Sequence, residues 1–161
     1  MRLYIKQKVW SFKDRFTIKD DVERDMYYVE GELFAFAKKL RLYNRQNKEQ
    51  LFIEQKLWRF LPEFDLYEDE QLVATVKKDF ALLKNNYTIT GPDWHIEGSV
   101  MAHDYVIKDG RNNVVADINK KWLSWGDTYE INIRDEESVS VLLGIVVVID
   151  AVIAQSNPPG Q

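Results

Sequence analysis

The sequence predicts a mainly β fold, a closed twelve-stranded antiparallel β-barrel that encloses one buried hydrophobic C-terminal α-helix. Three observations predict it. About twelve short segments of alternating polarity are separated by turn residues, one hairpin-like block occurs four times, and a single apolar segment near the C-terminus has no polar face. Such a segment must be buried on all sides, so the strands have to surround it.

The apolar segment runs from Val139 to Ala154 and carries eleven large apolar side chains and one charge, Asp150. Nine of its residues are Val or Ile, which weakens the helix prediction. Acidic residues and a serine at 135–138 and the sequence NPPG at 157–160 nevertheless favour a helix between them. At 1.5 Å per residue it reaches only about 24 Å, short of a bilayer core about 30 Å thick. We expect a central helix at 138–155, a single barrel domain at 1–154, and a flexible tail at 156–161.

The rest of the chain consists mostly of strands. Apolar and polar residues alternate with period two, as in antiparallel strands that face a core on one side. Runs between turn residues place the strands near 3–10, 15–19, 26–30, 33–43, 50–57, 63–67, 71–78, 85–90, 93–100, 103–108, 113–120 and 128–133. Connections this short allow hairpins and exclude parallel crossovers.

An internal repeat supports this count. Four fourteen-residue blocks, at 5–18, 53–66, 76–89 and 118–131, begin and end with an aliphatic residue. Their eighth positions are Phe12, Phe60, Leu83 and Trp125, and their twelfth positions are Phe16, Phe64, Tyr87 and Tyr129. We interpret each block as a strand, an aromatic-lined bend and a strand. A meander of twelve strands can close into a barrel whose lumen accommodates one helix.

Several motifs resemble the LURP-one-related family of bacterial and plant proteins, and the chain looks like a bacterial member. They are YYVEG at 27–31, KKLRLY at 38–43, HDYVIKD at 103–109 and KKWLSWGDTYEI at 120–131, together with the apolar end. The resemblance covers residues 1 to 154. It implies the tubby C-terminal fold, shared with tubby-like proteins and phospholipid scramblases, in which a twelve-stranded closed barrel surrounds a C-terminal helix. Tubby domains bind phosphoinositides through basic surface residues, but that site has no residue-by-residue match here.

Composition limits the classes of function. The net charge of −4 gives no general attraction to nucleic acid, so we expect no nucleic-acid partner. The chain contains no cysteine, which excludes disulfides, thiolate metal sites and cysteine nucleophiles. The N-terminus lacks the apolar core of a signal peptide, so we expect a cytoplasmic protein, which a basic surface could make membrane-peripheral, with no transmembrane span.

No catalytic or cofactor-binding motif is present, so we expect neither an enzyme nor a cofactor. His95 and His103 are the two histidines, and without a third ligand nearby they favour structural or solvated roles over a metal site. Asp104, Asp127 and Glu130 could form an acid/base set, but as carboxylates near turns they more simply accept hydrogen bonds from backbone amides.

Basic doublets are the candidate binding residues. If the repeated hairpins stand side by side, these doublets could form a ring near one rim that holds anionic lipid headgroups. The alternative is that they solvate a barrel end and balance acids such as Glu54, Asp79 and Asp117. Exposed Trp58, Trp122 or Trp125 at that rim would favour membrane contact, although packing roles are the simpler interpretation. The candidate contact residues are Lys38, Lys39, Arg41, Lys77, Lys78, Lys120 and Lys121.

Asp150 is the exception in the apolar helix. A buried carboxylate near a helix C-terminus opposes the helix dipole, so we expect it to emerge at the barrel mouth or to pair with an inward Lys or Arg. Inward positions of the repeat that offer partners are Gln7, Gln55, Lys78 and Lys120.

Three hypotheses for function follow. The first is a non-enzymatic cytoplasmic binding or scaffold module that contacts an unknown protein partner. The second is peripheral binding to anionic phospholipid or phosphoinositide, of which a scramblase-like activity is a weaker variant because the helix would have to leave the barrel. The third, an enzyme or carrier that uses the lumen, conflicts with a lumen filled by the helix.

Overall fold

The computed structural model contains twelve strands in one sheet and one long helix, and it describes residues 1–6, 15–32, 38–80, 86–123 and 126–156. The number of strands agrees with the sequence prediction. In chain order the strands are β1 (Arg2–Lys6), β2 (Phe16–Lys19), β3 (Asp25–Glu32), β4 (Lys39–Asn44), β5 (Glu49–Gln55), β6 (Glu63–Glu68), β7 (Gln71–Lys78), β8 (Tyr87–Thr90), β9 (Trp94–Ser99), β10 (Asp104–Asp109), β11 (Val114–Leu123) and β12 (Gly126–Ile133).

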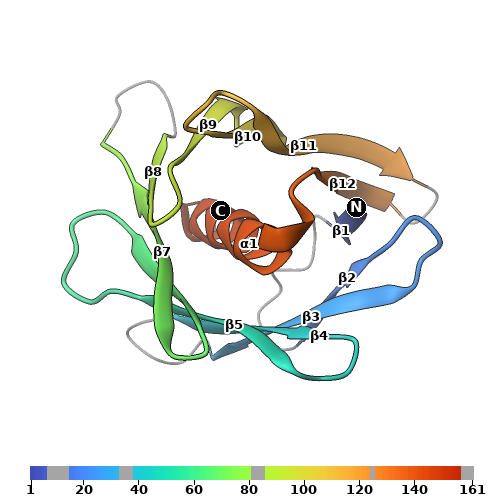
Figure 1. Ribbon diagram of the computed structural model, residues 1–161, viewed down its shortest axis with the longest axis horizontal. Coiled ribbons are helices and arrows are strands. Elements are labelled where there is room, and N and C mark those ends of the chain that lie inside the picture. Colours follow the sequence, from blue (N-terminus) through green and yellow to red (C-terminus); the bar gives the residue numbers. More distant parts are fainter. Residues whose placement is uncertain (7–14, 33–37, 81–85, 124–125, 157–161) are drawn as a thin grey trace.

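Sequence neighbours pair antiparallel around the sheet, and β1 also pairs with β12 (Figure 1). The order is β8-β7-β6-β5-β4-β3-β2-β1-β12-β11-β10-β9, so hydrogen bonds link every neighbour except β8 and β9. These two strands are joined by a short turn in which Gly91 has a φ of 106°. A Cβ there would lie 2.3 Å from the carbonyl oxygen of Val73 on β7. The barrel is therefore nearly closed, with one seam between β8 and β9.

The four repeated blocks are four hairpins, β1–β2, β5–β6, β7–β8 and β11–β12. The aliphatic residues at both ends of each block are buried, and so are the aromatic residues at the twelfth position. Strand β8 shows the alternation clearly, because Tyr87 and Ile89 are buried while Thr88 and Thr90 are exposed. The repeat therefore encodes which side chains point into the lumen.

The helix α1 (Val139–Ser156) follows a short 3-10 turn, η1 (Glu136–Ser138), and lies inside the barrel (Figure 1). It begins one residue later and ends one residue later than predicted. By length and composition α1 could cross a membrane, but 67% of it is buried inside the protein. The tail beyond residue 156 lies outside the described residues.

The closest approach between helix and barrel occurs at Gly144. A Cβ at this position would lie 2.2 Å from Cδ2 of Leu51 on β5 and 2.9 Å from Cδ2 of Leu66 on β6. Because glycine has no side chain, α1 can pack directly against these two strands.

Adjacent strands of an antiparallel sheet run in opposite directions, so the connections that follow odd-numbered strands all lie at one end of the barrel. We call this end the rim. It carries the loop from β5 to β6, the end of β7 and the loop from β9 to β10, and α1 ends toward it because β12 runs away from it.

Candidate functional site

Large apolar side chains are exposed at the rim. Trp58 and Phe60, in the loop from β5 to β6, are 96% and 92% exposed. The backbone at Trp58 has a φ of 57°, the left-handed region that most residues avoid. Phe80 beyond β7 and Met101 beyond β9 are exposed as well. Exposed apolar side chains that gather at one place, beside polar residues, mark interaction surfaces, so the rim is the leading candidate surface.

The simpler interpretation of the tryptophans, that they pack within or across strands, is wrong for Trp58. The repeat aligns Trp58 with a bend and not with a strand, and side chains in a bend are not held to the inward and outward alternation. Trp125 and the side chain of Trp122 lie outside the described residues.

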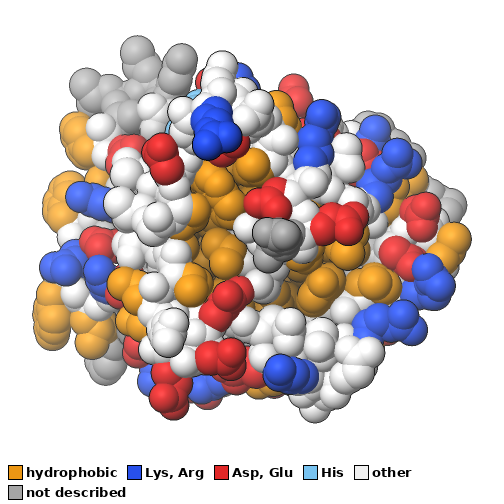
Figure 2. All heavy atoms as spheres, viewed as in Figure 1, with side chains coloured by type: hydrophobic (Ala, Val, Ile, Leu, Met, Phe, Trp, Pro, Cys, Tyr) orange, Lys and Arg blue, Asp and Glu red, His pale blue; other side chains and the backbone are white. Residues whose placement is uncertain are grey.

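The structure brings the candidate basic residues to the end of the barrel that carries the aromatic loops. Strand β4 starts at the rim, whereas β7 and β11 finish there, so the basic pairs of all three strands face this end. They do not form one patch, because β11 is separated from β4 by β12, β1, β2 and β3. Figure 2 shows hydrophobic and basic side chains next to one another along the left edge of the molecule, on the side of the barrel where Figure 1 labels β7.

Acidic neighbours balance part of this positive charge. Lys39 Nζ lies 4.0 Å from Glu54, the partner that the sequence suggested, and Lys121 Nζ lies 3.9 Å from Glu130. Arg41 contacts Glu32 and Glu49 at 3.0 and 3.5 Å and sits further from the rim.

The loop from β5 to β6 adds Lys56 and Arg59 to the rim. Both contact Glu63, at 2.8 and 3.2 Å. The hydrogen bond from Lys56, with the positive charges of Lys56 and Arg59, lowers the pKa of the Glu63 carboxyl group despite burial. Lys77 and Lys78 form no ion pair within the described part of the chain. Burial lowers the pKa of Lys38. The end of β7 therefore adds positive charge beside the aromatic loop, where Lys77 lies opposite Glu63 and helps to lower the pKa of that carboxyl.

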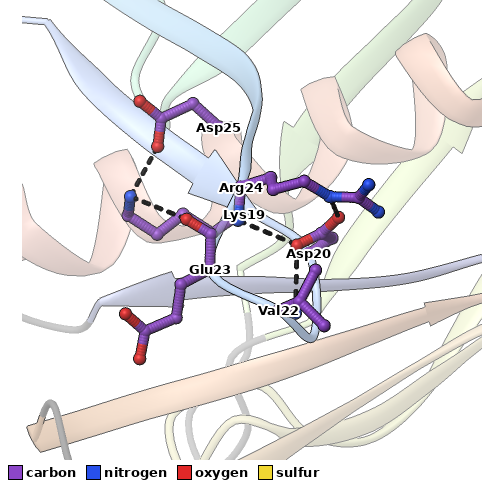
Figure 3. A network of polar contacts seen from close by, with 6 residues as sticks. All are labelled: Lys19, Asp20, Val22, Glu23, Arg24 and Asp25. Carbon is purple, nitrogen blue, oxygen red and sulfur yellow. Dashed lines mark hydrogen bonds and ion pairs between the residues drawn. The ribbon is translucent and has the colours of Figure 1, made fainter.

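The opposite end of the barrel has a different character. In the turn from β2 to β3, Asp20 accepts hydrogen bonds from the backbone N–H of Val22 and from the backbone and Nε of Arg24, at 3.0, 2.9 and 2.6 Å (Figure 3). Burial raises the pKa of Asp20, but these hydrogen bonds outweigh it and the net shift is downward. Lys19 also contacts Asp25 at 2.5 Å. Charges in this turn satisfy one another locally.

A second feature is a polar cluster buried between α1 and the barrel. Asp150 is buried, and its Oδ1 lies 3.1 Å from Nε2 of His103, in the loop from β9 to β10. Its Oδ2 accepts a hydrogen bond from the hydroxyl of Tyr129 on β12. The rings of His103 and Tyr129 stack with centroids 4.5 Å apart.

The expectation for Asp150 was therefore wrong in both forms. The carboxylate neither emerges at the mouth nor pairs with Lys or Arg, because the inward neighbours at its level are a histidine and a phenol. A charged residue in an apolar helix does signal a buried partner, and His103 was available in the sequence, but a separation of 47 positions along the chain hides the contact.

Burial dominates the electrostatics of this cluster. It raises the pKa of Asp150, and the neighbouring His103 only partly opposes this. Burial and the Asp150 charge together raise the pKa of Tyr87 on β8 to about 12, and they also raise the pKa of Tyr105 on β10 well above its usual value. The hydroxyl of Tyr105 is buried and has no hydrogen-bond partner among the residues that the structure describes. The cluster joins α1 to β12 and to the loop from β9 to β10, so it fastens the helix in place.

The remaining catalytic and metal candidates do not assemble into a site. His95 is exposed and lies 3.2 Å from Glu97, whereas His103 has the structural role that the sequence favoured. Glu130 accepts a hydrogen bond from the Tyr4 hydroxyl at 2.8 Å, so its partner is a side chain and not the predicted backbone amide. Asp104 is exposed, and the side chain of Asp127 lies outside the described residues. Within the described ranges, no three His, Asp or Glu side chains gather closely enough to hold a metal ion.

The family and its relatives agree with this architecture. The LURP-one-related family model matches residues 1–150. The uncharacterized protein YxjI of Bacillus subtilis (strain 168) is 36% identical over 153 residues, covering 95% of this chain and 94% of that protein. An X-ray structure of a protein from Arabidopsis thaliana superposes with a TM-score of 0.64 at 15% identity, covering 93% of this chain and 90% of that one, and so shares the fold. The chain belongs to the LURP-one-related family.

Proposed function

We propose that this protein is a cytoplasmic, non-enzymatic binding module that attaches peripherally to anionic membrane surfaces through its rim. The observation that carries the proposal is the exposure of Trp58 and Phe60 on either side of a basic residue, Arg59, at a barrel end where further lysines lie. Aromatic side chains favour the interface between headgroups and hydrocarbon, and Lys and Arg attract anionic lipids.

Two properties of the surface support a local contact. The whole chain carries a net charge of −4, so attraction to an anionic surface has to come from the rim and not from the protein as a whole. Lys77 and Lys78 lie at the end of β7, beside the loop that exposes the aromatic residues. Each basic residue near the surface contributes about 1 kcal/mol to such binding, which salt weakens.

Co-sedimentation with vesicles tests this proposal. The purified chain is mixed with vesicles of phosphatidylcholine alone or with added phosphatidylglycerol, at low and at physiological salt. We expect pelleting that requires the anionic lipid and decreases with salt. Trp58→Ser combined with Phe60→Ser should abolish it, whereas Val22→Ser, a change at an exposed apolar residue of the opposite end, should not.

The basic residues have their own matched control. Lys77→Gln combined with Lys78→Gln should reduce pelleting, whereas Arg45→Gln combined with Lys48→Gln, in the turn from β4 to β5 at the other end, should leave it unchanged. Absence of pelleting with either vesicle, or equal losses in both double variants, would contradict membrane binding. A scaffold module that contacts a soluble protein partner would then be the better account.

A further inference from the structure

The outer wall of the barrel carries a second surface, distinct from the exposed aromatic loop of the rim, that the sequence patterns do not reveal. A groove of about 580 Å³ lies across β4, β5 and β6, with Phe52 and Tyr67 among its lining residues. These two side chains occupy directly paired positions, and their ring centroids are 6.1 Å apart. The next paired position, on β7, is Leu72, which is 57% exposed. An aromatic and apolar row therefore crosses three strands on the outside of the barrel.

Carboxylates dominate the charge of this groove. Glu49, Glu54, Asp69 and Glu70 line it, and Arg41 is the one basic residue among the lining residues that the structure describes. Asp69 and Glu70 form the turn from β6 to β7, at the end of the barrel opposite the rim. A groove with an apolar floor and acidic borders is complementary to a cation that carries an apolar or planar group.

The same wall shows how a guanidinium group binds there. Arg41 lies over the ring of Phe52, 4.8 Å from its centroid, with Nε 3.5 Å from Glu49. Two strands further round the barrel, Arg15 stacks over Tyr28 at 4.1 Å. By contrast, no cation of the described residues lies over Tyr67, although Asp69 and Glu70 line the same groove.

We propose that this groove binds an extended, arginine-bearing segment of a partner protein, with the arginine side chain stacked on Tyr67 and its charge facing Asp69 and Glu70. Arginine fits better than lysine because its planar guanidinium stacks on aromatic rings and pairs with carboxylates in a fork. Side chains two apart in an extended segment point the same way, so an apolar residue two positions from the arginine can pack on Leu72.

The binding surface is independent of membrane attachment, because the groove opens on the outer wall and its acidic turn lies at the end opposite the rim. Anisotropy of a fluorescein-labelled peptide built from arginine, glycine and leucine measures the contact without lipid. The matched probe replaces arginine with citrulline, which keeps the shape and removes the charge. We expect saturable binding of the arginine peptide and affinity lower by about tenfold or more for the citrulline peptide, as for loss of one charge-assisted pair.

Variants locate the contact. Tyr67→Thr, and separately Asp69→Asn with Glu70→Gln, should each weaken binding of the arginine peptide, while Tyr67→Phe should retain it because the ring remains. The control is Asp21→Asn with Glu23→Gln, a double neutralisation in the turn from β2 to β3. If Tyr67→Thr fails to fold, the acidic pair still tests the groove.

Four results would overturn the assignment. The first two concern the peptides: equal affinity for the arginine and citrulline peptides, or no saturable binding of either. The third is a loss of affinity in the control variant equal to that in the groove variants. The fourth is coverage of the groove by a second copy of the chain, which light scattering would show as a dimer that Leu72→Asp dissociates.

Discussion

Replacing Asp150 tests how the barrel holds its helix. Asp150→Asn keeps the shape of the side chain, with a carbonyl oxygen that accepts from the Tyr129 hydroxyl and an amide NH2 group that can donate to Nε2 of a neutral His103. Asp150→Leu removes the acceptor for both groups. Each buried polar group left without a partner costs about 1–3 kcal/mol, so the Leu variant should be less stable than the Asn variant by about 2–6 kcal/mol.

The pH dependence separates the Asn variant from the wild type. The folded-state pKa of Asp150 is raised, whereas the carboxyl of an unfolded chain ionises near pH 4. Between these two pKa values the folded state holds more protons than the unfolded state. The free energy of unfolding therefore falls as pH rises through this window, and this contribution is fully present only below the unfolded pKa. Asparagine does not titrate, so the stability of Asp150→Asn relative to wild type should increase with pH.

Urea denaturation followed by tryptophan fluorescence, at a series of pH values between 4 and 8, measures both differences. The comparison requires that the free energy of unfolding falls with urea concentration at the same slope in each variant, because a changed slope indicates altered compactness of the unfolded or the folded state. An Asn variant that loses stability relative to wild type as pH rises would refute the reasoning, since it would mean that an ion pair with His103 outweighs the burial of the carboxylate. So would a Leu variant as stable as the Asn variant.

Further expectations concern single positions and are checked by the same denaturation assay. Gly144→Ala should destabilise the protein by about 1–3 kcal/mol, because the added methyl overlaps Leu51 and Leu66, although the substitution raises helix propensity; an unchanged midpoint would show that both leucines yield freely. Tyr105→Phe should leave stability equal or raise it by about 1 kcal/mol, since it removes a buried hydroxyl that has no partner in the described part of the chain; a loss of more than about 1 kcal/mol would indicate a hydrogen bond to this hydroxyl. Trp58→Ser should change stability by less than about 0.5 kcal/mol, as expected for a fully exposed side chain, and a larger loss would place Trp58 in the packed structure.

The barrel and its helix explain each other energetically. The helix has no polar face, and the strands bury one face each, so neither part satisfies its apolar surface alone. The buried residues of α1 run without interruption from Leu142 to Val152. The helix α1 and the strands of the barrel should therefore unfold together in a single transition.

The sequence by itself determined the number of strands, the four hairpins and the place of the helix, because each depends on local alternation, turn residues or an uninterrupted apolar run. The repeat also predicted which side chains point into the barrel: the aliphatic residues at both ends of each block and the aromatic residues at the twelfth position are all buried. The seam between β8 and β9 could not be predicted from the sequence, since local alternation does not show which neighbouring strands form hydrogen bonds with each other.

Only the tertiary structure decided the candidate surfaces. Trp58 and Phe60 lie in a bend, where no period of two fixes the direction of a side chain, so their exposure depends on how the loop leaves the barrel. Asp150 meets His103 across 47 residues, and the row of Phe52, Tyr67 and Leu72 comes together through strand register. These contacts arise from chain closure, which brings together residues that no local pattern relates.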